Sequence, residues 1–243
     1  MGGEKMTRAE LKEQAKAQLK GNVWKLFGIT VVYMLISMVV SWVASLVGGD
    51  GALTGIISLL GSIFVIYPAA MGLTKVFLNV TYGDDPKVAT LLDGFKINYI
   101  NNVLLYVLIS VFTTLWTLLF IIPGIIAAYS YTMAPYILLE HPELSAKEAI
   151  GYSKQMMKGH KFELFVLQLS FILWALLGIV TFGIAYIYVG PYITLTTTDF
   201  YHSIKGAVFP ETQDSTDSFT EAAADVIEQA STVVDNQASA VIE

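Results

Sequence analysis

Long runs of apolar residues, most of them in pairs joined by a short turn, alternate with charged stretches along this chain. A run of about 20 apolar residues is the length that an α-helix needs to cross a bilayer. The pattern predicts an all-α membrane protein with six crossings in three hairpins. We expect the crossings at about residues 26–47, 52–76, 103–121, 125–139, 164–180 and 184–204, with a turn at Pro123 and Gly124.

Residues 6–20 have the pattern of an amphipathic helix that lies on a membrane surface. Thr7 and Glu10 have the spacing of a capping box, which marks a helix start. An apolar stripe and a basic row each recur every four residues on adjoining faces. The stripe comprises Leu11, Ala15 and Leu19, and the row comprises Arg8, Lys12, Lys16 and Lys20. Such a helix suits the surface of an anionic leaflet, and an ordinary solvated helix is the alternative.

Residues 145–158 predict a second surface helix. Ser145 and Glu148 have the spacing of another capping box, and Lys147, Lys154, Lys158 and Lys161 lie close to one face. With six crossings, all 14 Lys and Arg residues fall on one side of the membrane. The positive-inside rule places that side in the cytoplasm, with both termini.

An internal repeat accounts for this alternation. Three segments align without gaps, and each begins at the glycine that ends a charged stretch. The return crossing of each hairpin contains a proline. The glycines are Gly21, Gly94 and Gly159, and the prolines are Pro68, Pro135 and Pro191. The predicted unit is therefore a surface helix, a crossing, a turn and a kinked crossing, repeated three times. The prolines are expected to kink the return crossings. Either these kinks only determine the shape of the helices, or they free backbone carbonyl groups that can bind a ligand.

Composition agrees with a bilayer as the solvent. The chain has 243 residues, of which 55% are hydrophobic and 14% are charged, and a soluble domain has nearer a quarter charged residues. The chain contains no cysteine, which excludes disulfides and thiolate chemistry. Residues 206–243 contain eight acidic residues and no Lys or Arg. We expect this acidic cytoplasmic tail to be disordered or to form one amphipathic helix.

Several short motifs resemble a known family. They are Gly21-Asn22, Ile122-Pro123-Gly124-Ile125, Leu144 to Ile150, Met157-Lys158-Gly159, and Pro191-Tyr192 with Phe200-Tyr201. On these residues the chain resembles, over about residues 5–205, the bacterial membrane-protein family catalogued as domain of unknown function 975. It is also distantly similar to the membrane domain attached to some glycerophosphodiester phosphodiesterases. The resemblance implies a six-helix protein of the bacterial plasma membrane, and it supplies no functional residues.

Asp199 is the one acid well inside the last apolar stretch, and with Thr197 and Tyr201 it forms a candidate polar membrane site. Its position near the inner interface suggests capping or pairing with a lysine, and contact with a headgroup or an ion is the alternative. The three histidines lack the spacing of metal ligands. Neither a phosphate loop nor paired intramembrane carboxylates are present, so we expect no catalysis, no metal and no cofactor.

The sequence thus favours a non-enzymatic membrane protein that binds anionic lipid headgroups or a partner protein through basic side chains. These side chains are Arg8, Lys12, Lys16, Lys147, Lys154 and Lys158. A small permease for a neutral or lipidic substrate is the alternative. Its path would be lined by Asn101, Asn102, Gln168, Thr197 and Asp199. An accessory subunit or a homo-oligomer is a further hypothesis, and no nucleic-acid partner is expected.

Overall fold

The computed structural model describes residues 6–49, 51–181, 183–206 and 208–209, and over these ranges it contains helices and no β-strand. The predicted all-α fold is confirmed. The described residues up to Val208 form one compact unit. The predicted acidic tail lies, from residue 210 onwards, outside the described residues.

Five helical stretches among the described residues are long and apolar enough to cross a membrane. Their outer surfaces expose large apolar side chains, such as Leu118 with 84% of its surface accessible. A continuous apolar surface of this size is unfavourable in water, so these helices are suited to a lipid environment. The stretches are α2 (Val23–Gly48), α3 to α4 (Ala52–Thr81), α6 (Tyr99–Leu119), α7 to α8 (Ile121–Glu140) and α10 to α11 (Lys161–Val180).

Three of these stretches have irregular middles. A π-helical segment, η1 (Ser62–Ile66), separates α3 (Ala52–Gly61) from α4 (Tyr67–Thr81), and Pro68 lies in the first turn of α4. Similarly, α7 (Ile121–Tyr131) ends shortly before α8 (Ala134–Glu140), which has Pro135 in its first turn. The third stretch is divided into α10 (Lys161–Leu169) and α11 (Ile172–Val180). Proline removes a donor and blocks the preceding turn, so two of the predicted kinks coincide with breaks in the helix.

The predicted turn at Pro123 and Gly124 is wrong. The chain turns at Phe120, whose backbone is extended with φ −157° and ψ 143°, and Pro123 is the third residue of α7. The first N–H groups of a helix have no partner within the helix, so a proline costs little there.

The sixth predicted crossing corresponds to α12 (Tyr186–Lys205), which is not among the five apolar stretches. Its apolar side chains lie inside the protein, and threonines lower its mean hydropathy. The buried residues include Val189, Tyr192, Leu195 and Phe200. A helix shielded by its neighbours does not need an apolar outer face, and the sixth crossing stays a prediction.

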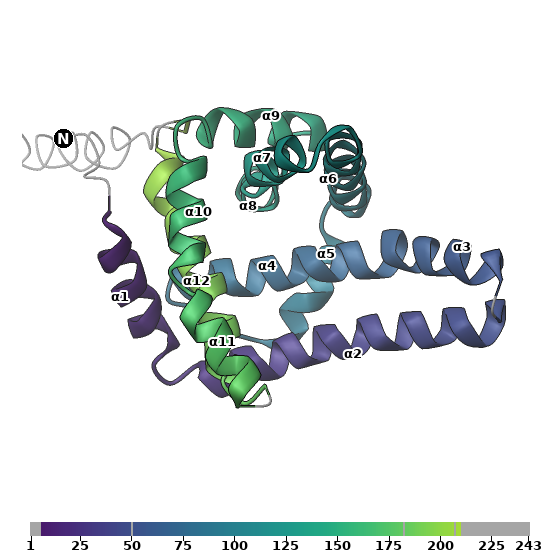
Figure 1. Ribbon diagram of the computed structural model, residues 1–243, viewed down its shortest axis with the longest axis horizontal. Helices are drawn as coiled ribbons and strands as arrows, with labels where there is room; N and C mark the ends of the chain where they lie inside the picture. Colours follow the sequence, from purple (N-terminus) through teal and green to yellow (C-terminus); the bar gives the residue numbers. More distant parts are fainter. Residues whose placement is uncertain (1–5, 50, 182, 207, 210–243) are drawn as a thin grey trace, which may run out of the picture. The chain divides into compact units, whose positions relative to one another are not determined.

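Each return helix carries a short helical segment against its side. The 3₁₀ helix η2 (Val88–Leu92) and α5 (Asp93–Lys96) pack on α4, and α9 (Ala146–Met156) packs on α8. In these two cases the segment follows its return helix along the chain. The helix α1 (Arg8–Leu19) precedes the first hairpin and packs on α12, the last return helix (Figure 1). The N-terminal helix therefore closes a cycle of three similar contacts.

The apolar stripe of α1 takes part in this contact. Leu11, Ala15 and Leu19 are at most 1% exposed. We predicted that this stripe faces lipid, and the structure corrects this, because the stripe packs against the protein. Both capping boxes form as predicted, from Thr7 with Glu10 and from Ser145 with Glu148.

The contact between α4 and the short helices depends on two glycines. A Cβ atom at Gly72 would lie 2.1 Å from the backbone oxygen of Leu91, and one at Gly94 would lie 1.9 Å from that of Pro68. No side chain fits at these distances, so the backbones touch directly. Gly94 therefore serves close packing inside α5.

The three aligned glycines are not equivalent. Gly21 and Gly159 have φ values of +89° and +88°, and each precedes a long helix by two residues. In the middle unit the residue with positive φ is Asn98, with φ 47°, directly before α6. The predicted ungapped alignment thus places the middle unit four residues too early, and the repeat stays a prediction.

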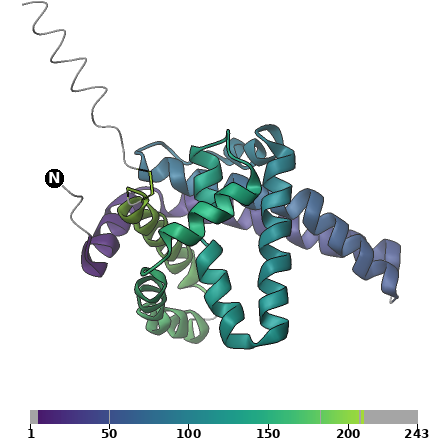
Figure 2. The same ribbon diagram turned by 90° about the horizontal axis from the view of Figure 1, so that it is seen from above.

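The hairpins run in different directions. In Figure 1 the α2–α3 hairpin crosses the picture while α6 and α7 are seen nearly end-on, and Figure 2 shows the teal α6–α7 hairpin lengthwise. The first residues of α2 also line a groove with Ile184 and Ile187, at the start of the last return helix. Six parallel crossings would place these two helix starts on opposite membrane surfaces, so the structure does not show that arrangement.

Candidate functional site

A groove of about 680 Å³ lies where α1 packs on α12. Three lysines on α1 and directly after it, spaced four residues apart, line the groove together with Glu13, and Tyr188 and Tyr192 of α12 line the opposite wall. The lysines are Lys12, Lys16 and Lys20. Their spacing follows from the helical period, which places residues four apart on the same face. The groove therefore combines positive charge with aromatic surface.

This groove continues into a second space of about 460 Å³ that has no charged lining. The two spaces share Val23 and Tyr188, and Trp24 and Ile187 extend the lining away from the lysines. The combined path, the α1 groove, is thus positively charged at one end and apolar at the other. A molecule with an anionic head and a hydrocarbon chain matches this distribution.

A second basic groove of about 470 Å³ lies where α9 packs beside α6 and α7. Its lysines are Lys154, Lys158 and Lys161, and Trp116, Ile126 and Tyr131 are among its aromatic and apolar lining. In this α9 groove, as in the α1 groove, the lysines begin on the packed short helix and continue beyond its end, here to the first residue of α10. Both grooves also have a tyrosine one helical turn before the proline of a return helix, Tyr188 before Pro191 and Tyr131 before Pro135. The two grooves therefore occupy similar places in successive units.

One lysine of each groove lies over an aromatic ring. The Lys12 Nζ atom lies 4.4 Å from the centre of the Phe171 ring, and the Lys154 Nζ atom lies 5.5 Å from that of Tyr131. A cation over an aromatic face is attracted by the negative charge of that face. Partial burial lowers the pKa of Lys12 below its ordinary value. A bound anion would offset this effect, because it favours the charged ammonium group.

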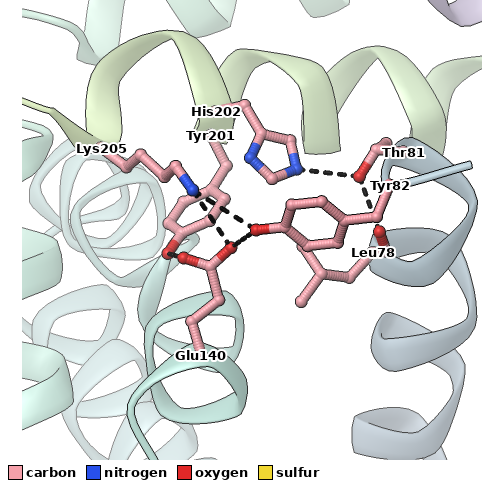
Figure 3. Close-up of polar contacts among 7 residues, drawn as sticks. All are labelled: Leu78, Thr81, Tyr82, Glu140, Tyr201, His202 and Lys205. Atoms are coloured by element: carbon pink, nitrogen blue, oxygen red, sulfur yellow. Dashed lines mark hydrogen bonds and ion pairs between the residues drawn. The ribbon is translucent and has the colours of Figure 1, made fainter. Parts of the chain in front are cut away.

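A polar cluster joins the ends of the three return helices (Figure 3). The Glu140 carboxylate, at the end of α8, accepts hydrogen bonds from Tyr82 and, at 2.7 Å, from Tyr201, and Lys205 lies 3.5 Å away. His202 bonds to Thr81 at 2.8 Å. Burial raises the pKa of Tyr82, and the neighbouring Glu140 raises it further. Because each return helix contributes a bonded side chain, the cluster holds these three ends together.

Asp199 is fully buried and lies apart from that cluster. Its Oδ1 atom accepts a 2.9 Å hydrogen bond from the Nε2 atom of Gln18, on α1. The expected lysine partner is absent among the described residues, since Gln18 supplies the one bond that Asp199 receives. The sequence offered no signal for Gln18, which is 181 residues away.

The three residues of the predicted polar membrane site do not meet. Thr197 donates to the backbone oxygen of Ile193 at 2.9 Å, Tyr201 bonds to Glu140, and Asp199 bonds to Gln18. Residues two apart on a helix point to nearly opposite sides, so Asp199 faces away from the other two. Of the six predicted basic residues, Lys12 and Lys16 line the α1 groove and Lys154 and Lys158 line the α9 groove. Arg8 and Lys147 line neither groove.

The polar residues proposed for a permeation path are also separated. Asn102 donates to the backbone oxygens of Gly94 and Ile97, at 3.0 and 2.7 Å, and thereby secures the start of α6. Gln168 accepts a 2.7 Å bond from Tyr129. The bonding partners of these side chains, like those of Thr197 and Asp199, lie on different elements.

Comparison with known proteins locates the chain in one family. The family described as protein of unknown function (DUF975) has a model that matches residues 5–130 and 117–208. Searches of curated proteins and of solved structures found no match, so the similarity to glycerophosphodiester phosphodiesterases stays a prediction. The family match covers most of the chain and includes every helix described above. The chain therefore belongs to the DUF975 family of proteins of unknown function.

Proposed function

We propose that this protein is a non-enzymatic membrane protein that binds anionic phospholipids in the α1 groove and the α9 groove. The observation that carries the proposal is the continuity of the α1 groove, from three lysines to the apolar surface around Trp24. A phosphate would lie among the lysines, and an acyl chain would follow the apolar part. Lysine binds phosphate as a compact point charge, and an apolar wall replaces the water around the chain.

Two further features support a lipid over a soluble anion. The walls of both grooves are mainly aromatic and apolar. A small soluble anion would make no contact with these walls, whereas an acyl chain would cover them. The lysine stems can lie along such walls while their ammonium groups reach the headgroup layer. Each lysine near an anionic membrane surface contributes about 1 kcal/mol of attraction.

The same proposal includes the topology. We place the protein in the bacterial plasma membrane, with the lysine-bearing short helices at the cytoplasmic leaflet. The distribution of Lys and Arg supports this orientation, since the cytoplasmic leaflet carries the anionic lipids. The three short helices, each packed on a return helix, support an arrangement in three units.

Tryptophan fluorescence provides a direct test, because Trp24 lines the α1 groove and Trp42 lies far along α2 with 62% of its surface exposed. Two variants would each retain one of these tryptophans, with the other three changed to Phe. Both would be reconstituted with lipids brominated on the acyl chain, which quench nearby indoles. We expect brominated phosphatidylglycerol to quench Trp24 more than brominated phosphatidylcholine does, and to show no such preference at Trp42.

Charge variants complete the test. Lys12→Gln/Lys16→Gln removes two positive charges, or about 2 kcal/mol, and should reduce the preference of Trp24 for phosphatidylglycerol roughly 30-fold. Lys87→Gln, on an exposed loop outside both grooves, should leave it unchanged. Equal quenching of Trp24 by the two lipids would contradict the proposal. In that case a stoichiometric protein in native mass spectra would favour a partner-binding function.

The permease hypothesis receives no comparable support. Asn102, Gln168, Thr197 and Asp199 each bond to a different partner, and no hydrogen bond joins any two of them.

A further inference from the structure

The hydrogen bond between Gln18 and Asp199 is incomplete. Gln18 Nε2 donates to Asp199 Oδ1, while two other atoms of the same pair, Gln18 Oε1 and Asp199 Oδ2, are buried without a partner among the described residues. Both of these atoms are oxygens, and a carboxylate and an amide oxygen can only accept hydrogen bonds. Buried polar atoms normally have partners, so a missing donor is indicated at this place.

The surroundings of Asp199 supply no positive charge that could stabilise an ionised carboxylate. In the part of the chain that the structure describes, Asp199 forms no ion pair, and Gln18 is its one hydrogen-bond partner. The elements packed around α12 carry further charged and titratable groups. These are Arg8, Glu10, Lys12, Glu13 and Lys16 on α1 with Lys20 directly after it, Lys25 and Tyr33 on α2, Lys75 on α4, Tyr136 and Glu140 on α8, and His160, Lys161 and Glu163 beside or on α10, with Tyr201, His202 and Lys205 on α12 itself. A buried carboxylate without an ionic partner is neutralised by taking up a proton.

We propose that Asp199 is a proton-binding site, in which the protonated carboxyl donates from Oδ2 to Gln18 Oε1. One proton then satisfies both of the unpartnered oxygens. The acid and the amide form a pair with two hydrogen bonds, one in each direction. This pair locks α1 onto α12 and so closes the cycle of the three short helices.

A metal ion fits these oxygens less well than a proton does. Hard cations require six or more oxygen ligands, or several waters that stay bound. The described residues contain no cluster of three His, Asp or Glu side chains that could hold a metal. The two oxygens are also sealed from solvent, so they leave no surface for bound water.

The proton makes the position of α1 dependent on pH. Loss of the proton removes the bond to Gln18 Oε1 and leaves a buried negative charge beside that oxygen. Both changes favour separation of α1 from α12 as the pH rises. Because α1 supplies the three lysines of the α1 groove, this separation also dismantles that groove. Asp199→Asn retains both hydrogen bonds, since its amide can donate to Gln18 Oε1, and it cannot titrate.

Infrared spectroscopy detects the proton directly. The full chain, in phosphatidylcholine nanodiscs at mildly acidic pH, should show the carbonyl stretching band of a protonated carboxylic acid. The difference spectrum between the native protein and Asp199→Asn should contain this band. A difference spectrum that contains only carboxylate bands would overturn the proposal.

Cysteine labelling tests the consequence for α1, because the chain has no native cysteine. Ala15→Cys places a thiol in the buried face of α1. Ala149→Cys is the control, because it places a thiol in the equally buried face of α9, which does not contain the Gln18–Asp199 pair. The ratio of the two maleimide labelling rates cancels the ionisation of the thiol itself. This ratio should rise about tenfold per pH unit while Asp199 remains mostly protonated.

The same ratio should be independent of pH in the Asp199→Asn background. A flat ratio in the native background would overturn the proposal, and so would an identical rise in the Asn variant. These outcomes do not depend on lipid binding, so they distinguish this inference from the proposed function.

Discussion

Tyr201, near the end of α12, donates a 2.7 Å hydrogen bond to the carboxylate of Glu140, the last residue of α8. Tyr82, which follows α4, donates to the same carboxylate. Glu140 thereby connects the ends of three helices that are far apart in the sequence. The carboxylate is an acceptor only, so it depends on these hydroxyl groups and on Lys205 to offset its partial burial.

We expect Tyr201→Phe to lower the free energy of unfolding by about 2 kcal/mol, since a hydrogen bond to a charged group contributes about that amount. The stacking of the ring on Tyr136, at 5.2 Å between centres, would remain. Tyr82→Phe should cost less, about 0.5 kcal/mol, because Tyr82 is 56% exposed and water can replace its hydroxyl. Far-UV circular dichroism during titration with a denaturing detergent measures both changes. Equal losses in the two variants would contradict this view of the cluster.

A methyl group at Gly72 should destabilise the protein. The Cβ atom of Gly72→Ala would lie 2.1 Å from the Leu91 carbonyl oxygen, and a backbone atom cannot move aside without shifting η2. Overpacking of this kind costs about 1–3 kcal/mol. Gly55→Ala is the matched control, because nothing lies within 4 Å of its Cβ position in α3. Alanine favours a helix over glycine, so the control should be neutral or stabilising by up to about 1 kcal/mol. The same detergent titration compares them, and a harmless Gly72→Ala would refute the close contact.

The start of α9 should respond to acid. Hydrogen bonds from the Ser145 side chain and backbone lower the pKa of Glu148 from its ordinary value of 4.5. A carboxyl whose pKa is lowered by folding stabilises the folded state above the unfolded value, and this contribution is lost as the pH falls through the folded value. Hydrogen exchange of the first amides of α9 should therefore become less protected, relative to Glu148→Gln, as the pH falls below about 4.5. Gln also suits a capping box and does not titrate, so parallel behaviour of the two proteins would contradict the prediction.

The α9 groove should select anionic lipid as the α1 groove does. With Trp116 as the sole tryptophan, brominated phosphatidylglycerol should quench it in preference to phosphatidylcholine. Lys154→Gln/Lys158→Gln should reduce this preference roughly 30-fold, from the loss of two charges near the membrane surface. Lys147→Gln is the matched control on the same helix, since Lys147 does not line the groove. An equal effect of both variants would show a response to net charge alone.

The helix starts were predictable because they depend on neighbours in the chain. The boxes of Thr7 with Glu10 and of Ser145 with Glu148 form within four residues of backbone, whatever surrounds them. Pro123 shows the limit of such reasoning. The same residue that suggested a turn also fits the first turn of a helix, and only the extended backbone at Phe120 decided between them.

The candidate site was predictable in part for the same reason. Helical spacing placed Lys12 beside Lys16, and Lys154 beside Lys158, on single faces, and those faces line the two grooves. Spacing could not show that the opposite wall of the α1 groove is α12, nor that Arg8 and Lys147 lie outside the two grooves.

By itself, the sequence determined the apolar helices, their approximate limits and the faces on which the basic residues lie. These properties follow from hydropathy and from the helical period, which act over a few residues. The tertiary structure alone decided that α1 packs on α12, that Gln18 meets Asp199, and that Glu140 gathers Tyr82 and Tyr201. Such contacts join residues 58 to 181 positions apart, and they depend on which buried faces and polar atoms satisfy one another after the chain has folded.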